Sequence, residues 1–94
     1  MAELRLSPLV QDQLVDKGLK FELNKKQRDK IKKLLNDLKE NPNIGEISHV
    51  SISTDYYIEQ YLGEKLFITF HYDIEKYKNK TTVVIKGVAI FYKM

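Results

Sequence analysis

The residue types best suited to chemistry gather on one face of a predicted strand at 65–74, with the sequence KLFITFHYDI. Apolar and polar residues alternate there with a period of two, as in a strand that buries one face. One face is apolar or aromatic throughout: Leu66, Ile68, Phe70, Tyr72 and Ile74. The other face carries Lys65, Phe67, Thr69, His71 and Asp73. An ammonium, a hydroxyl, an imidazole and a carboxylate in one row can bind a charged ligand and exchange protons near neutral pH.

A second group of functional candidates is a basic segment at 25–40. It contains six lysines and one arginine against three acidic residues, a net charge of +4, whereas the whole chain carries +3. The basic residues crowd the first half of the segment: Lys25, Lys26, Arg28, Lys30, Lys32 and Lys33. Two interpretations stay open. The residues form a solvated helix face, or they follow the phosphates of RNA or DNA.

The bulk composition limits the class of protein. A chain of 94 residues makes one domain, and 43% hydrophobic with 31% charged residues is ordinary for a globular protein. The absence of cysteine excludes disulfides and thiolate metal sites, and two histidines far apart predict no metal site. No cofactor is expected. No stretch is apolar enough to predict a membrane span or a secretory signal, so we expect a cytoplasmic protein.

The first half of the chain predicts a strand and two helices. A short strand is expected at 3–6, and Ser7 with Pro8 predicts the start of an amphipathic helix that stops near Gly18. Residues 19–23 alternate and predict an extended connector. Asn24 and Gln27 resemble a capping box, which begins a second helix. An apolar stripe follows this helix until Asn41-Pro42 ends it: Ile31, Leu34, Leu35 and Leu38.

The second half predicts strands. They are expected at 47–52, 56–62, 65–74, 81–85 and 88–92, with turns at 63–64 and 79–80 and a bend or bulge at Gly87. Helices that precede an antiparallel meander predict an α+β domain. We expect a short N-terminal strand and a two-helix hairpin packed on an antiparallel sheet of three to four further strands.

Four segments match the pattern of a known family, and together they span nearly the whole chain. They are RLSPLVQDQL at 5–14, LLNDLKENPN at 34–43, DYYIEQYLGEKLFITF at 55–70 and TTVVIKGVAIFYK at 81–93. They resemble the first strand and helix, the end of the second helix, the strand–turn–strand and the last strand of the RelE/ParE superfamily. Members of this superfamily are toxins of type II toxin–antitoxin systems. The resemblance implies a RelE-like fold.

In the ribonuclease branch, the resemblance implies metal-independent cleavage of mRNA in the ribosomal A site. Such cleavage needs a base, fixed cations and an acid. Lys65 falls where the family commonly has an Arg that binds the scissile phosphate, and Lys86 falls where another basic residue or His is common. Tyr92 lies near a C-terminal Tyr or His that often assists. Glu59 is a candidate base, although a cross-strand ion pair with Lys65 is an equally good interpretation of that carboxylate.

Three further positions bear on this implied site. His71 shares the polar strand face with Lys65 and is a second acid–base candidate. Tyr57 and Tyr61 stand where basic members have lysines. They can stack on RNA bases, or they can pack against the helices or a partner. Both expected cationic positions carry Lys instead of Arg, and Lys cannot clamp a phosphate with two parallel hydrogen bonds.

The implied partners are a cognate acidic antitoxin and mRNA on the ribosome. The alternatives are a ParE-like inhibitor of DNA gyrase without nuclease activity, a non-catalytic relative that only binds its partner, and a small nucleic-acid-binding domain outside the superfamily. A nuclease predicts that Lys65, Lys86 and either Glu59 or His71 converge on one phosphate-sized point. The toxin-like alternatives without nuclease activity predict that these residues diverge or are paired within the protein.

Overall fold

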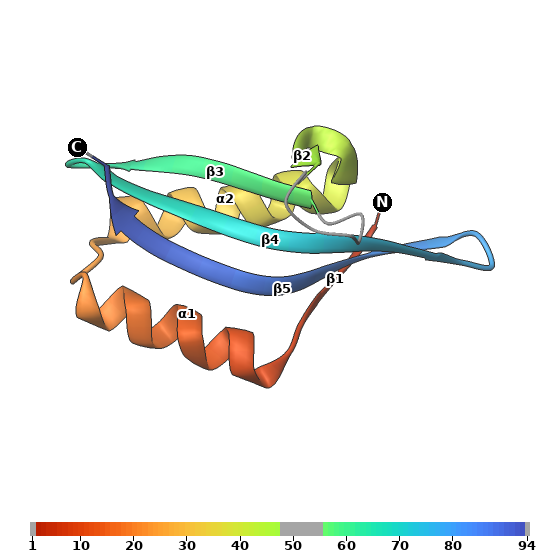
Figure 1. The fold of residues 1–94 in the computed structure, drawn as a ribbon, viewed down its shortest axis with the longest axis horizontal. Helices are drawn as coiled ribbons and strands as arrows, with labels where there is room; N and C mark the ends of the chain where they lie inside the picture. Colours follow the sequence, from red (N-terminus) through yellow and green to blue (C-terminus); the bar gives the residue numbers. More distant parts are fainter. Residues whose placement is uncertain (1, 48–55, 94) are drawn as a thin grey trace.

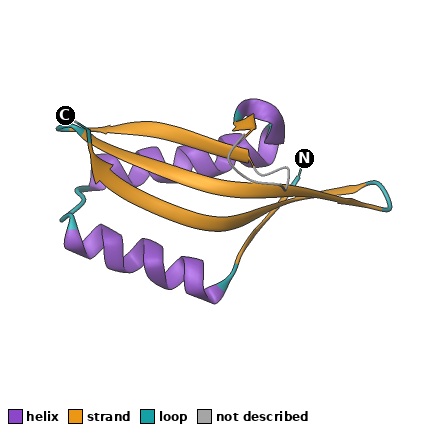
Figure 2. Ribbon diagram, in the orientation of Figure 1, coloured by secondary structure: helices purple, strands orange, loops and turns teal. Residues whose placement is uncertain are grey.

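The computed structural model describes residues 2–47 and 56–93, which form a five-stranded sheet with both helices on one face (Figures 1 and 2). The elements follow one another as β1 (Glu3–Leu6), α1 (Pro8–Lys20), α2 (Lys25–Glu40), the single 3-10 turn η1 (Pro42–Ile44), β2 (Glu46–Ile47), β3 (Tyr56–Gly63), β4 (Leu66–Tyr77) and β5 (Lys80–Tyr92). The strand order is β1-β5-β4-β3-β2. β1 is parallel to β5, and the other neighbours are antiparallel. The predicted α+β class is therefore confirmed. The predicted strand at 47–52 lies almost entirely outside the described residues.

The helix starts are as predicted. The Ser7 hydroxyl accepts a hydrogen bond from the Val10 amide at 3.2 Å, with Pro8 in the first turn. Asn24 and Gln27 form the reciprocal capping box, with hydrogen bonds of 2.8 and 3.0 Å. Neither helix in the described part of the chain is long and apolar enough to cross a membrane.

The predicted end of α1 at Gly18 is wrong, because the helix continues to Lys20 and the connector is correspondingly shorter. The chain turns at Glu22, whose φ of 51° supplies the left-handed conformation that Gly18 was expected to supply. The amides of Phe21 and Leu23 donate to the carbonyls of Lys17 and Gly18, which satisfies the last turn of the helix.

Both hairpin turns lie one residue away from their predicted positions. The β3–β4 turn consists of Glu64 and Lys65, with φ of 54° and 66°. The β4–β5 turn consists of Lys78 and Asn79, with φ of 46° and 66°. Positive φ at both central residues is what a two-residue type I′ turn requires. Lys65 is consequently a turn residue and does not lie on the β4 face.

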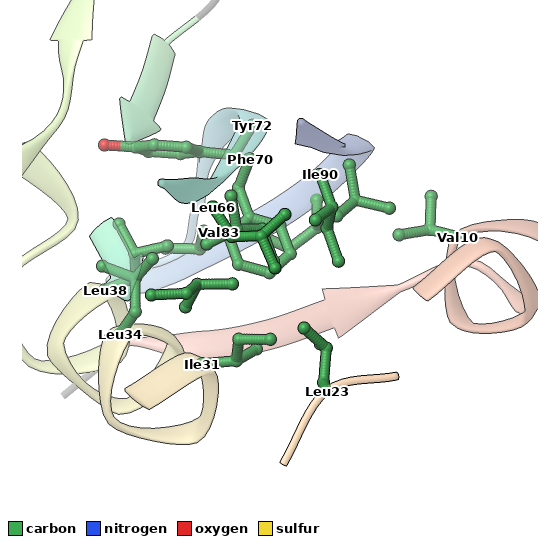
Figure 3. Packing of buried hydrophobic residues seen from close by; sticks show 14 of the residues in the cluster. Val10, Leu23, Ile31, Leu34, Leu38, Leu66, Phe70, Tyr72, Val83 and Ile90 are labelled. Atoms are coloured by element: carbon green, nitrogen blue, oxygen red, sulfur yellow. The ribbon is translucent and has the colours of Figure 1, made fainter. Parts of the chain in front are cut away.

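The core forms between the helices and the predicted apolar face of β4. Leu66, Ile68, Phe70 and Tyr72 are at most 3% exposed and pack with Val83, Ile85 and Ile90 of β5 and with Ile31, Leu34 and Leu38 of α2 (Figure 3). α1 packs chiefly against β5, and Val10 is its buried residue. Leu9 and Val15 of the same helix are 67% and 62% exposed, and Val15 lines a groove between α1 and α2.

A buried hydroxyl fastens the end of α2 to the sheet. The Tyr72 hydroxyl donates to the Pro42 carbonyl at 2.9 Å and accepts from the Gly45 amide at 3.0 Å. Burial raises the pKa of Tyr72 above its ordinary value of 10.0, while the hydrogen bond from Gly45 opposes the shift. The close approach requires Gly45, because a Cβ there would collide with the Tyr72 hydroxyl and lie 2.7 Å from the Tyr57 carbonyl oxygen.

Tyr72→Phe should lower the free energy of unfolding by about 1–3 kcal/mol, because it leaves two backbone groups without their partner. The raised pKa means that wild-type stability is complete below about pH 10 and falls as pH rises through the pKa of the folded state. Tyr72→Phe lacks this ionisable hydroxyl, so its free energy of unfolding should fall less than that of wild type at alkaline pH. Denaturant titrations at several pH values test both effects, with the exposed Tyr77→Phe as a control that should behave as wild type. Equal alkaline losses in all three proteins would contradict the assignment.

Gly45→Ala should destabilise the protein by about 1–3 kcal/mol, since the new methyl group overlaps backbone and ring atoms that cannot move freely. Gly87→Ala is the matched control, because a Cβ there meets nothing within 4 Å and Gly87 has no positive φ. Thermal unfolding of the two variants should therefore separate by several degrees. Equal unfolding temperatures of the two variants would show that the atoms around Gly45 move to accept the methyl group at no cost in stability.

Candidate functional site

The polar face of β4 lies on the side of the sheet opposite both described helices. Outward-facing side chains of three strands meet there. They are Tyr57, Glu59 and Tyr61 of β3, Phe67, Thr69, His71 and Asp73 of β4, and Lys86, Ala89 and Phe91 of β5. We call this surface the open face. Its existence follows from the alternation of β4, because the residues between the buried ones must point away from the core.

A β-bulge in β5 determines which β5 residues reach the open face. His71 pairs with Gly87 while Tyr72 pairs with Ile85, so Lys86 is the extra residue. The predicted bulge at Gly87 is confirmed. Lys86 continues the alternation of Val83 and Ile85, which face the core, so its ammonium lies on the open face, 3.7 Å from the Asp73 carboxylate. Beyond the bulge the alternation is reversed, so that Val88 and Ile90 face the core and Phe91 faces outward.

Glu59 lies on the open face opposite Thr69, one diagonal step from His71. Its carboxylate accepts a hydrogen bond from the Lys93 ammonium at 2.9 Å. The same ammonium lies 4.9 Å from the centre of the Phe67 ring. The alternative ion pair between Glu59 and Lys65 is therefore wrong. Lys65 lies in the turn, four residues from Thr69, which is the strand partner of Glu59. Lys93 binds the Glu59 carboxylate instead.

His71 lies directly opposite Tyr57, with ring centres 6.4 Å apart. The Tyr57 hydroxyl donates to the Glu46 carboxylate at 2.6 Å. This hydrogen bond to the Glu46 carboxylate raises the pKa of Tyr57 above its ordinary value of 10.0. Beside these residues a polar hollow of about 500 Å³ is lined by Gly45, Glu46, Tyr57, Glu59 and Lys93, among others. The His71 imidazole and the Tyr57 phenol can therefore contact a ligand from the same side of the sheet.

Two predicted catalytic residues lie away from this group. Lys65 is six residues from His71 along the hairpin, a separation of about 20 Å at the rise of a strand. Tyr92 faces the helices, where its ring makes an edge contact with Phe21 at 5.6 Å. The reversed alternation after the bulge explains the placement of Tyr92. The structure thus brings Glu59, His71 and Lys86 to one region and separates Lys65 and Tyr92 from it.

The predicted RNA-binding lysines of α2 divide between two surfaces. Lys25, Lys26, Lys30 and Lys33, with Asp29, line a shallow hollow of about 510 Å³. Arg28 and Lys32 instead border an apolar groove of about 560 Å³ between α1 and α2. Of the first set, Lys30 reaches the edge of the open face, where its ammonium lies 5.8 Å from the centre of the Tyr61 ring. The basic helix is therefore connected to the open face through Lys30.

The sequence analysis placed Phe67 on this face without a role and missed Phe91 and Lys93 as members of the surface. Tyr61 and Phe67 have ring centres 5.0 Å apart, and Phe67 and Phe91 have ring centres 6.2 Å apart with nearly parallel planes. The alternation of β4 predicted the place of Phe67 on the open face, and its ring neighbours come from the pairing of β4 with β3 and β5. The position of Phe91 depends on the bulge, and Lys93 follows it. Among residues 2–47 and 56–93, no group of three or more His, Asp or Glu residues could hold a metal ion.

Comparison with models of protein families, with curated proteins and with solved structures finds no match for this chain. Membership of the RelE/ParE superfamily stays a prediction from the sequence pattern.

The ion pairs of the open face should contribute little to stability because both partners are solvent-accessible. Glu59→Gln and Lys86→Met should each change the free energy of unfolding by less than about 1 kcal/mol. Chemical denaturation measures this change. A loss of several kcal/mol would show that the pairs hold the sheet together, and these substitutions could then not be used to test function.

Proposed function

We propose that this chain is a toxin-type domain of the RelE/ParE superfamily that acts on RNA through the open face. The helical hairpin on one side of the sheet and the final strand paired with the first support the resemblance seen in the four sequence segments. The domain is a metal-independent endoribonuclease that cleaves mRNA on the ribosome. Its other partner is an acidic antitoxin that holds it inactive, because an acidic chain complements the basic surface of α2.

The observation that carries this proposal is the placement of a carboxylate, an imidazole and an ammonium on three adjacent strands. Glu59, His71 and Lys86 extend from β3, β4 and β5 on the same side of the sheet. His71 lies one diagonal step from Glu59 and beside the bulge that carries Lys86, and such neighbours on adjacent strands are about 5–8 Å apart at the backbone. Glu59 and Lys86 are two strands apart, about 10 Å or more, so their side chains would have to reach a phosphodiester from both sides of His71.

In the proposed reaction, Glu59 removes the proton from a 2′-hydroxyl as that oxygen attacks the adjacent phosphorus. Lys86 leaves Asp73 to stabilise the charge that develops on the phosphoryl oxygens. His71 then protonates the departing 5′-oxygen. The P–O5′ bond breaks as the 2′-O–P bond forms, so the products are a 2′,3′-cyclic phosphate and a 5′-hydroxyl. Glu59 thus gains the proton of the 2′-hydroxyl, and His71 gives its own proton to the 5′-oxygen. Proton exchange with solvent restores both groups.

A second candidate is a toxin-type domain without nuclease activity. It either inhibits DNA gyrase or only binds its partner. The observation that favours it is the pairing within the protein of Glu59 with Lys93 and of Lys86 with Asp73, together with the distance of Lys65. Charged groups that neutralise each other in the folded protein are what a surface without catalysis predicts.

Inducible expression in bacteria separates the two candidates. The proteins are wild type, His71→Ala, Lys86→Ala and, as a matched control, Lys65→Ala, which removes a lysine from the turn. Wild type and Lys65→Ala should arrest growth and create new mRNA 5′ ends within codons, measured by primer extension. His71→Ala and Lys86→Ala should lower the cleavage rate at least about 100-fold, the usual contribution of an acid–base group or a fixed cation.

Other outcomes contradict the nuclease. Growth arrest with intact mRNA would favour the gyrase inhibitor, which a supercoiling assay then tests directly. No arrest would favour the domain that only binds its partner. Loss of cleavage in Lys65→Ala but not in Lys86→Ala would move the phosphate site to the β3–β4 turn.

A further inference from the structure

We infer that Tyr61, Phe67 and Phe91 form a stacking platform that binds single-stranded nucleic acid directly, without the ribosome. The three rings come from β3, β4 and β5, and the register places Phe67 opposite both Tyr61 and Phe91. They form one continuous aromatic row across the open face, with ring centres 5.0 and 6.2 Å apart. A row across three strands is about 10 Å wide, which is room for two or three bases on aromatic side chains of a sheet.

The rings are accessible from solvent. Tyr61 is 48% exposed, and Phe67 and Phe91 are partly exposed although the other face of the sheet is buried. None of the described helices covers them. Aromatic rings that served only to pair the strands could be buried under a helix, and here they remain on the surface. Solvent-accessible aromatic rings of this kind can stack on the faces of bases.

Two cations lie against the platform, one over its middle ring and one at its Tyr61 end. The Lys93 ammonium lies over Phe67 at 4.9 Å, and the Lys30 ammonium lies 5.8 Å from the centre of Tyr61. Lys30 also lines the hollow on α2 together with Lys25, Lys26 and Lys33. A single-stranded nucleic acid whose bases stack on the three rings can therefore place its phosphates against Lys93 and continue onto the lysines of α2.

This charge arrangement indicates nucleic acid as the occupant instead of a second protein. The platform combines apolar rings with Lys93 over its middle ring and with Lys30 and the other α2 lysines beyond its Tyr61 end, which complements a chain of bases and phosphates. Lys93 must leave Phe67 for a base to stack there, and a phosphate gives that ammonium a new partner in place of Glu59. Because rings recognise the face of a base, binding should tolerate many sequences and should not require a 2′-hydroxyl.

The platform agrees with the proposed action on RNA but does not require cleavage, so the two proposals can fail separately. Binding is measured by fluorescence anisotropy with the full chain and a labelled oligodeoxynucleotide of about eight nucleotides, at about 50 mM salt. DNA lacks the 2′-hydroxyl that the cleavage step needs, so nuclease activity cannot alter the result. An abasic oligonucleotide of the same length reports binding to the phosphates alone.

Phe67→Leu and Tyr61→Leu should each weaken binding about 5- to 100-fold, while affinity for the abasic oligonucleotide stays the same. Tyr77→Leu is the matched control. It removes a tyrosine that is even more exposed than Tyr61 and has its own lysine contact, near the tip of the β4–β5 hairpin, and should bind as wild type. Lys30→Gln should reduce the slope of log affinity against log salt by about 0.7, the value for one phosphate contact on a single strand.

Equal affinity of wild type for the abasic and the normal oligonucleotide would overturn the platform, and this comparison needs no variant. So would unchanged binding in Phe67→Leu and Tyr61→Leu. Failure of the chain to bind the oligonucleotide, with binding of an acidic peptide that Tyr61→Leu abolishes, would assign the rings to a protein partner. If the platform holds while His71→Ala leaves mRNA unaffected, the nuclease fails and the binding surface stands.

Discussion

The alternation of β4 is the constraint on which the rest of the structure depends. Leu66, Ile68, Phe70 and Tyr72 are almost completely buried. The face that they form belongs to one hydrophobic core with residues of both helices. β4 is the central strand and is paired along its length with β5. A helix on its other face would bury His71 and the charged residues beside it, at a high desolvation cost. The second face therefore stays open, and the candidate site lies on it.

The bulge at Lys86 and Gly87 links the core to the open face. Without the extra residue, Ala89 and Phe91 would point toward the helices and Ile90 would point to solvent. The bulge reverses this phase, so that β5 supplies apolar residues to the core on both sides of it. The same reversal brings Phe91 beside Phe67 and sends Tyr92 to Phe21. One local irregularity thus serves packing and places the Phe91 ring on the surface.

The charges of the open face are held by partners that a ligand can replace. Exposed ion pairs such as Lys86 with Asp73 contribute about 0–1 kcal/mol each. A phosphate can therefore displace Asp73 or Glu59 at little cost to folding. Pairing in the free protein is thus compatible with phosphate binding, and only the measured effect of each lysine on cleavage separates a nuclease from a binding surface.

The sequence by itself determined the local features: the Ser7 and Asn24 caps, the apolar stripe of α2 and the buried face of β4. These depend on residues within one or two turns, where period and capping chemistry are sufficient. The tertiary structure alone decided which residues meet. The turn occupied by Lys65, the phase of β5 after its bulge and the Glu59–Lys93 pair all depend on register between strands. Register depends on long-range pairing, and a shift of one residue moves each side chain to the opposite face.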